Sequence, residues 1–464
     1  MGDGRWSGDD EGWRAMGRRR TARWRRARVR RGHRSARARG AVVAALLLCT
    51  TAALPGRSAL AAGTPGPYAF APDARPIIGA TSTADAAPLT PGTTYKSSLP
   101  SGAKSHYRLD LDATSDAYVS AMAIPAAGST VSASDGIKVS VQDADGSDCS
   151  FDTKTFGIAH TPRPIAVWAA REVSSNRPRC EGAGTYYVIV ERVGTANSAP
   201  DTWDLELFAT SEPRLKKTDA TSAPDGWNSA SPEPLTGEDV RRDGGSGFAS
   251  AASVGQGVWN SDLNPGRTLF YRVPLDWGRQ LYATAELGSS NGRDGSVPGA
   301  LNLSLYNPVR GFVDDASTSY NGNQKAVELD PLPPVAYENR YAVPKRFKGV
   351  RFAGSYYLVV HLAADVAEQY GDGPLQLTLR VRVWGAAQAG PGYAGESEPG
   401  GVFQVAEDDQ WAGAGGAFGA GGGAGDGGGA AMTVLAVSGI GAGTLVLVVL
   451  GVWAVVVRRR VGAW

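Results

Sequence analysis

The sequence predicts an all-β protein with two tandem β-sandwich domains, followed by one C-terminal transmembrane helix. Three observations lead to this prediction. One stretch of the chain occurs twice, which indicates a duplicated domain. Short β-branched and aromatic runs alternate with Gly, Asp, Asn and Ser turns, which favours strands over helices. An apolar run without a charged residue stands near the C-terminus, at 432–457, and is long enough to span a bilayer.

The repeated stretch begins at Tyr95 and again at Trp259. At a shift of 164 positions, Leu99-Pro-Ser-Gly102 matches Leu263-Asn-Pro-Gly266. At a shift of 170, Ala183–Val190 matches Ala353–Val360, with the same Tyr-Tyr pair in each. Fixed-offset identity at Gly and aromatic positions, with conservative exchanges at apolar ones, is typical of a duplicated domain. We therefore predict β-sandwich repeats at 76–213 and 245–385.

Charge is distributed unevenly along the chain. Residues 1–61 hold fifteen arginines and four acidic residues, whereas 62–457 hold 29 basic and 41 acidic residues, a net charge of −12. Binding to phosphate backbones needs clustered Lys and Arg, so the acidic middle argues against nucleic acid as a partner. The basic N-terminus has an alternative interpretation as a nucleic-acid-binding arm. The apolar run that follows it favours a signal peptide instead.

The N-terminal region has the order of a secretory signal peptide. A basic head precedes the apolar run Ala41–Cys49, and the small residues Ser58–Ala62 follow. The apolar run is too short to cross a bilayer, which needs about 20 residues. We predict a signal peptide over 1–61, with cleavage near its end, and an extended Pro- and Ala-rich leader over 62–75.

Between and after the repeats the composition changes. Residues 214–244 are rich in Ser, Pro, Asp and Gly, which predicts a linker. Residues 386–431 are rich in Gly and Ala, which predicts a flexible tether. The transmembrane helix over 432–457 is followed by Arg458–Arg460, so the tail 458–464 is predicted to be cytoplasmic and the repeats to lie outside the cell membrane.

The predicted membrane helix contains Gly439 and Gly443, spaced as in helices that pack closely against one another. This spacing predicts a homodimer through the membrane helix. Glycine is common in membrane helices, so an unpaired single span stays open as the alternative.

The three cysteines predict one disulfide bond. Cys49 lies in the signal segment, which leaves Cys149 and Cys180 as a pair. In the second repeat Val313 and Val350 stand at the matching positions. Both cysteines are thus replaced by apolar residues, as expected if the two positions face one core. We predict a Cys149–Cys180 bond and a Val313–Val350 contact.

The repeats resemble the bacterial pre-peptidase C-terminal domain family. The elements that carry the resemblance in the first repeat are Tyr95, Leu99-Pro-Ser-Gly102, Tyr107-Arg-Leu109 and Gly184-Thr-Tyr-Tyr-Val188. The resemblance covers most of 80–210 and 245–385. It implies jelly-roll-like β-sandwiches of secreted proteins, often binding modules beside a peptidase. No peptidase domain is attached to the sequence in hand.

Three kinds of site can be weighed from the residues. No Gly-x-Ser-x-Gly, His-Glu-x-x-His or P-loop motif is present, so no catalytic residue and no cofactor is predicted. Asp143, Asp145 and Asp148 have spacings found in calcium loops, and a solvated hairpin turn is the competing interpretation. Trp227 and Trp277 lie in loop-like stretches and are candidates for a carbohydrate- or peptide-binding platform.

These observations predict a membrane-anchored binding or scaffolding protein of the bacterial cell surface, without catalytic activity. Its partner is an extracytoplasmic protein or a carbohydrate. One alternative is an accessory subunit of a secreted or surface peptidase or other hydrolase, which the resemblance suggests. A hydrolase with a scattered active site is the other alternative.

Overall fold

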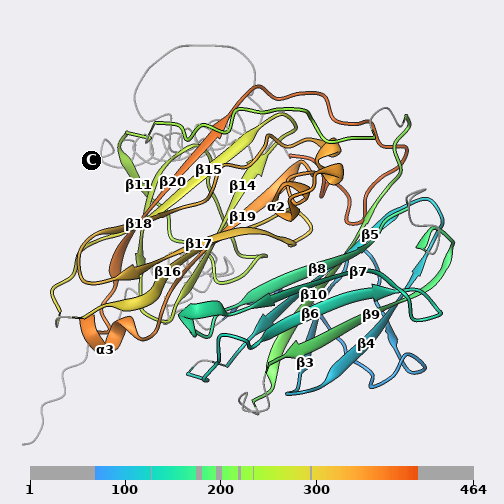
Figure 1. The fold of residues 1–464 in the computed structure, drawn as a ribbon, viewed down its shortest axis with the longest axis horizontal. Helices are drawn as coiled ribbons and strands as arrows, with labels where there is room; N and C mark the ends of the chain where they lie inside the picture. The colour runs from blue at the N-terminus through green and yellow to red at the C-terminus, as the bar shows by residue number, and fades with distance from the viewer. Residues whose placement is uncertain are drawn as a thin grey trace, which may run out of the picture. The chain divides into compact units, whose positions relative to one another are not determined.

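The computed structural model describes residues 68–405, apart from 127, 174–179, 195–200, 218–220, 234 and 293–294. These residues form two β-sandwiches, each built from two five-stranded sheets (Figure 1). The all-β, two-sandwich prediction is therefore confirmed, and both sandwiches belong to one compact unit. Within the described range, none of the helices combines the length and the apolar character needed to cross a membrane. The predicted signal peptide (1–61), membrane helix (432–457) and tail (458–464) lie outside that range, as do Gly439 and Gly443.

The first sandwich consists of the sheets β1-β3-β10-β5-β8 and β2-β4-β9-β6-β7. The chain passes back and forth between them, as in jelly-roll sandwiches. The two short first strands pair in parallel and the other pairs are antiparallel. The strands are β1 (Arg75–Pro76), β2 (Ala87–Pro88), β3 (Thr94–Leu99), β4 (Lys104–Leu111), β5 (Asp116–Ile124), β6 (Gly136–Gln142), β7 (Asp148–Thr155), β8 (Ile165–Arg171), β9 (Gly184–Val193) and β10 (Trp203–Glu212), with the 3-10 helix η1 (Gly157–Ala159).

The second sandwich repeats both sheet orders, as β11-β13-β20-β15-β18 and β12-β14-β19-β16-β17. Its strands are β11 (Asp239–Arg241), β12 (Ala252–Ser253), β13 (Gly257–Leu263), β14 (Thr268–Leu275), β15 (Gln280–Leu287), β16 (Val297–Tyr306), β17 (Phe312–Tyr320), β18 (Lys325–Glu328), β19 (Gly354–Leu362) and β20 (Leu375–Trp384). Three short helical turns join them: η3 (Tyr337–Tyr341), α2 (Lys345–Lys348) and α3 (Val366–Tyr370).

The duplication extends to details of geometry. Gly102 and Gly266 both adopt positive φ, at 66° and 76°, where a residue with a Cβ would be strained. The Tyr186 hydroxyl donates to the Gly182 carbonyl at 2.7 Å. At the matching place the Tyr356 hydroxyl donates to the Phe352 carbonyl at 2.8 Å. The aligned glycines therefore serve the same turn in both repeats, and the aligned tyrosines form the same hydrogen bond from their hydroxyl groups.

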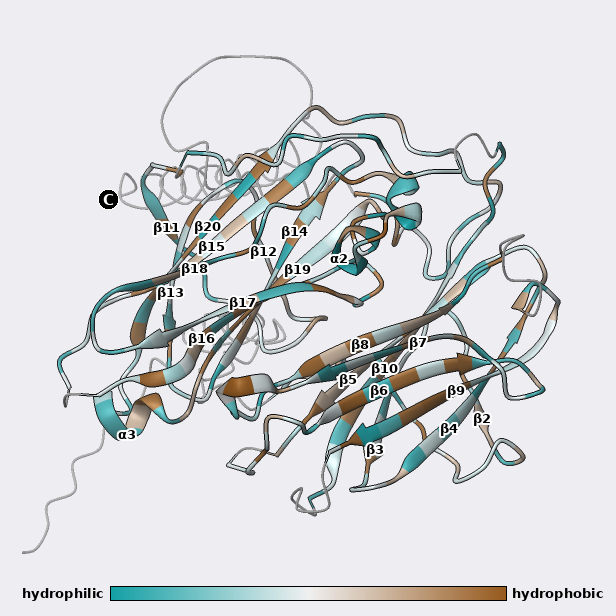
Figure 2. Cartoon of the chain, viewed as in Figure 1, coloured by the Kyte–Doolittle hydropathy of each residue, from teal (hydrophilic) through white to brown (hydrophobic). Residues whose placement is uncertain are grey.

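Each sandwich has its own core between its two sheets. Tyr107 and Tyr271, the aligned tyrosines of the repeat, are both buried there. Alternate residues of the strands point into these cores, since side chains of a strand alternate between its faces. Figure 2 shows the resulting hydrophobic residues along β6 and β9 of the first sandwich. Burying one such Val or Leu side chain stabilises the fold by about 1.5–3 kcal/mol.

The predicted disulfide between Cys149 and Cys180 is present. Both cysteines lie in the core of the first sandwich. Val313 and Val350 are buried in the core of the second, at 4% and 3% exposure. The covalent link of one repeat is thus replaced by apolar side chains in the other.

Three predicted boundaries need correction, because segments expected to be unpacked are ordered against the sandwiches. In the leader, Phe70 packs against the junction described below, and Arg75–Pro76 pairs with β3. The linker 214–244 contains β11. The first part of the tether pairs with the end of the first sandwich, since Ser211 and Glu398 exchange two backbone hydrogen bonds of 2.8 and 3.0 Å. Composition alone missed these contacts because few of the residues involved are apolar.

Candidate functional site

In the sheet β1-β3-β10-β5-β8, the central strand β5 is buried on both of its faces. Along β5, Val119 and Ala121 face the core of their own sandwich, whereas Tyr118 and Met122 face the other way and are buried too. Burial on the second face requires another packing partner. That partner is the second sandwich, and we call the contact the junction. Its apolar part includes Met122, Ile124, Ala166, Phe248, Phe270, Tyr306 and Val359.

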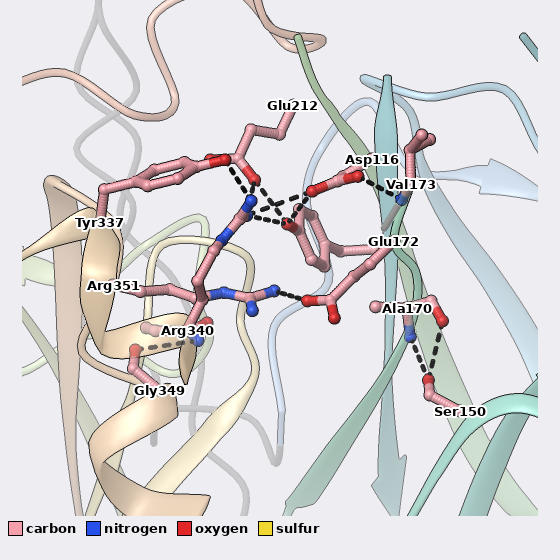
Figure 3. Close-up of polar contacts among 12 residues, drawn as sticks. Asp116, Ser150, Ala170, Glu172, Val173, Glu212, Tyr337, Arg340, Gly349 and Arg351 are labelled. Carbon is pink, nitrogen blue, oxygen red and sulfur yellow. Dashed lines mark hydrogen bonds and ion pairs between the residues drawn. The ribbon is translucent and has the colours of Figure 1, made fainter. Parts of the chain in front are cut away.

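A charged cluster lies in the junction, centred on Arg340 of η3 (Figure 3). Its Nη2 donates to Glu212 Oε2 at 2.9 Å and to Asp116 Oδ2 at 3.1 Å. The Tyr118 hydroxyl donates to Glu212 Oε2 at 2.5 Å, and the Tyr393 hydroxyl donates to Glu212 Oε1 at 2.7 Å. One arginine of the second sandwich therefore joins two carboxylates that lie opposite each other on β5 and β10.

The cluster shifts the pKa of its members. Burial raises the pKa of Asp116 to about 6; the nearby Glu212 charge adds to the rise and Arg340 opposes it. Burial by itself would lower the pKa of Arg340, but Glu212, Tyr118 and Asp116 raise it well above its ordinary value. Arg340 therefore stays charged, and Asp116 takes up a proton at a higher pH than an exposed aspartate does.

Two further buried arginines of the second sandwich have carboxylate partners on the first. Arg310 Nη1 lies 2.6 Å from Glu206 Oε1, and Arg351 forms an ion pair with Glu172. The Arg351 guanidinium also lies 5.1 Å from the centre of the Tyr118 ring. Removing one partner of a buried ion pair leaves a charge without compensation, which destabilises strongly. Loss of either arginine is therefore expected to weaken the packing of the two sandwiches.

The C-terminal segment after β20 closes one side of the junction. Phe403 is buried and its ring stacks on that of Phe352, with 4.9 Å between the centroids. Tyr393 contributes its hydroxyl to Glu212. The sequence offered a signal here, since Tyr393 and Phe403 are large aromatic residues in a stretch otherwise rich in Gly.

A groove of about 810 Å³ lies on the second sandwich, and we call it the tryptophan groove. Trp227 and Phe347 meet edge to face at 5.5 Å in its wall, and Trp384 is 50% exposed. Gln388 and Asp225 add polar groups to the lining. Sequence reasoning placed Trp227 in a binding platform and missed Trp384, the last residue of β20.

Trp277 does not belong to an exposed platform. It is 8% exposed and packs in the core of the second sandwich. The backbone of Gly390 passes so close that a Cβ there would lie 2.6 Å from the indole nitrogen. The expectation that Trp277 is free to meet a ligand is wrong, because the chain after β20 folds back over its ring.

Of the three aspartates of the candidate calcium loop, Asp143 and Asp145 lie in the hairpin turn between β6 and β7, and Asp148 is the first residue of β7. Asp143 Oδ1 accepts hydrogen bonds from the backbone of Asp145 and Ser147, at 3.0 and 2.8 Å. Asp148 Oδ1 accepts one from Gln142 Nε2 at 3.0 Å. In the part of the chain that the structure describes, no group of three or more His, Cys, Asp or Glu side chains is arranged to hold a metal ion. The hairpin-turn interpretation accounts for these residues.

No family model and no curated protein matches the chain. The resemblance to the pre-peptidase C-terminal domain therefore stays a prediction. Among solved structures, a tandem of two carbohydrate-binding modules from Paenibacillus barcinonensis Xyn10C is similar, with 11% identity, 61% of this chain and 83% of that chain covered, and a TM-score of 0.18. The CUB1-EGF-CUB2 region of human MASP-1/3 is also similar, with 9% identity, 62% of this chain and 99% of that chain covered, and a TM-score of 0.16.

A third similar structure is the M60 catalytic domain with two CBM51 domains from Clostridium perfringens ZmpB, at 11% identity. It is matched over 60% of this chain and 34% of that chain, with a TM-score of 0.15. With TM-scores this low, these likenesses carry no conclusion about the function of this chain.

Proposed function

We propose that the protein is a non-catalytic carbohydrate-binding scaffold of the cell surface, held there by the predicted membrane helix. The observation that carries the proposal is the tryptophan groove. Its volume of about 810 Å³ falls in the range of small-molecule sites, which combine apolar and aromatic walls with a few polar groups.

A sugar suits the chemistry of this groove better than a purely apolar ligand. Sugar rings have apolar C–H faces and hydroxyl edges. The exposed Trp384 indole offers a flat apolar surface for such a face. Gln388 and Asp225, in the same lining, offer hydrogen-bonding groups for hydroxyls. A polypeptide is the competing ligand, and the experiment below separates the two.

The proposed location rests on segments outside the described residues. The signal peptide 1–61 directs export, and 432–457 followed by Arg458–Arg460 places the sandwiches outside the membrane. The Cys149–Cys180 bond supports this location, since disulfides persist in oxidising compartments. The role as a scaffold is supported by the buried ion pairs that join the sandwiches.

The test is binding of the full chain, purified in detergent, to an array of neutral cell-wall and plant oligosaccharides, with unrelated peptides on the same array. We expect binding to a sugar that falls at least tenfold in Trp384→Ala. The matched control is Phe151→Ala, which removes a 61% exposed aromatic ring from the first sandwich. Binding to peptides alone would overturn the carbohydrate assignment, and release of hydrolysis products from the bound sugar would overturn the absence of catalysis.

A further inference from the structure

A second cavity, of about 500 Å³, lies at one edge of the junction, and we call it the junction cleft. The first sandwich contributes Pro125 and the segment Pro162–Pro164 to its wall, and the second contributes Pro265–Thr268. Proline fixes its own φ, so these walls are stiff. Because both sandwiches line the cleft, it exists only when they are packed together.

Arg163 lies in this cleft and is only 7% exposed. Its Nη2 donates to the Phe156 carbonyl at 3.2 Å, and its Nη1 is 3.4 Å from the Thr161 carbonyl. It forms no ion pair within 4.0 Å among the described residues, whereas the junction arginines Arg310, Arg340 and Arg351 all do. A guanidinium has five N–H donors, so Arg163 retains donors beyond those that bond its own loop.

Arg267 is the second arginine of the cleft. It is half-buried, and no hydrogen bond or ion pair joins its side chain to the described part of the chain. Burial lowers the pKa of Arg267, and no carboxylate opposes that effect. Asp365 is the acidic residue of the lining and is exposed. Among the residues that the structure describes, the cleft is thus lined by two cations and one exposed carboxylate.

Two arginines, one from each sandwich, line the same cleft, and neither forms an ion pair with a carboxylate of the described residues, so together they offer a site for an oxyanion. We propose that the junction cleft binds a phosphate, sulfate or carboxylate group carried on a body about the size of a monosaccharide. Arg163 and Arg267 donate charge-assisted hydrogen bonds to the oxyanion. The proline walls and the side chain of Tyr68 enclose the rest of the ligand. This site is separate from the tryptophan groove and does not depend on the function proposed for it.

The position of the cleft has a consequence for the junction. A ligand held between Arg163 of the first sandwich and Arg267 of the second binds only the packed arrangement. Ligand binding to the folded state alone raises its apparent stability by mass action. Anion binding is therefore expected to stabilise the packing of the two sandwiches, in addition to occupying the cleft.

The experiment measures binding to the full chain by calorimetry and by thermal shift. The probes are inorganic phosphate, inorganic sulfate, glucose 6-phosphate, glucose 6-sulfate and glucuronate, with glucose as the neutral control. We expect the charged sugars to bind and to raise the melting temperature, and glucose to do neither. Binding of inorganic phosphate or sulfate as tightly as the charged sugars would overturn the assignment of a sugar-sized ligand. If none of the anions binds or raises the melting temperature, the proposed anion site is wrong.

Variants assign the binding to the two arginines. Arg267→Gln is expected to weaken the charged sugars about tenfold or more, because it removes a charge-assisted hydrogen bond. Arg163→Lys keeps the charge but loses the fork of donors, and we expect a smaller loss. The control Arg108→Gln removes an exposed arginine of β4 and leaves binding unchanged. Wild-type affinity in Arg267→Gln would overturn the proposal. Trp384→Ala reports on the groove alone and is expected to leave anion binding intact.

Discussion

Glu212 of the first sandwich and Trp384 of the second occupy the same place in the repeated fold. Leu99 pairs with Trp203, and its counterpart Leu263 pairs with Leu375, so the last residues of β10 and β20 correspond. Glu212 is 1% exposed and receives Arg340, whereas Trp384 is 50% exposed and lines a groove. The strand residues paired with them differ as well, since Asp116 in the first sandwich corresponds to Gln280 in the second.

The inward faces of the same strands show the opposite behaviour. Leu205 and Leu207 of β10 are buried in one core, and Leu377 and Leu379 of β20 are buried in the other. Each core must be filled by its own two sheets, so inward positions stay apolar in both repeats. The residue type at an outward position depends on what covers that position. The second sandwich covers the outward positions of the first repeat, whereas the linker and solvent cover those of the second repeat. The duplicated fold therefore keeps its cores alike and its outer faces different.

The largest effect is expected where the two outer faces differ most. Arg340→Met leaves Glu212 and Asp116 buried beside each other without a cation, and we expect a loss of about 3–5 kcal/mol in the free energy of unfolding. Urea unfolding followed by tryptophan fluorescence measures it. The control is Arg380→Met in the second sandwich, whose pair with Glu286 is partly exposed, with an expected loss of up to about 1 kcal/mol. Equal losses would contradict the contrast between the two faces.

Next comes the covalent difference between the cores. The double variant Cys149→Val/Cys180→Val gives the first sandwich the residues of the second, and opens a link between residues 31 positions apart. By the chain-entropy model we expect a loss of about 3–4 kcal/mol. Hydrogen exchange of β6 and β9 should rise. Reductant should then have no further effect on the variant. Equal acceleration in β16 and β19 would show that the bond does not act on the first sandwich alone.

The two sandwiches are also expected to differ in how their stability depends on pH. His361 of β19 corresponds to Glu191 of β9, since they pair with the aligned residues Thr268 and Lys104. Burial, helped by the charge of Arg163, lowers the pKa of His361 to about 3. The unfolded chain takes up this proton below about pH 6.5, so stability decreases as the pH falls from that value towards 3. Between pH 6.5 and 5 the loss is about 2 kcal/mol.

At the same position of the first sandwich, Glu191 affects stability in a lower pH range. Burial by itself would raise the pKa of Glu191, but Lys104 and Lys138 lower it below its ordinary value. Its contribution to stability is present above the unfolded pKa of about 4.3 and is lost only below it. Urea unfolding at several pH values tests the pair: His361→Gln should flatten the dependence between pH 6.5 and 5, and Glu191→Gln should not. An unchanged slope in His361→Gln would contradict the burial of a neutral histidine.

The smallest expected effect comes from one pair of aligned hydroxyls. The Tyr118 hydroxyl donates to the Glu212 carboxylate at 2.5 Å, whereas the aligned Tyr282 hydroxyl lies 3.4 Å from the Ala230 carbonyl. We expect Tyr118→Phe to cost about 1.5 kcal/mol, as for a hydrogen bond to a charged group. Tyr282→Phe should change the free energy of unfolding by less than about 0.5 kcal/mol. The same urea measurement compares the two, and a larger loss in Tyr282→Phe would reverse the assignment of the buried face.

The sequence predicted part of the candidate site, and the reason why a prediction succeeded or failed differs from residue to residue. The alignment of Cys149 and Cys180 with two valines predicted their pairing, because both positions have to face a core. Trp227, chosen as a platform residue, lies in the wall of the tryptophan groove. Trp277 was chosen on the same grounds and is buried, because a later segment covers it. Loop composition shows that a side chain is near the surface of its own element, but not what packs over that element.

The sequence by itself determined the two sandwiches, their duplication and the disulfide. These follow from local strand patterns and from internal repetition, which need no knowledge of distant contacts. Only the tertiary structure decided that the outward face of β5 and β10 is an interior, where Arg340, Glu212 and Asp116 meet. It also decided that Arg163 and Arg267 share a cleft. The physical reason is that the sequence of a strand does not show what covers its outward face. The environment of an outward residue is set by the distant segment that packs against it.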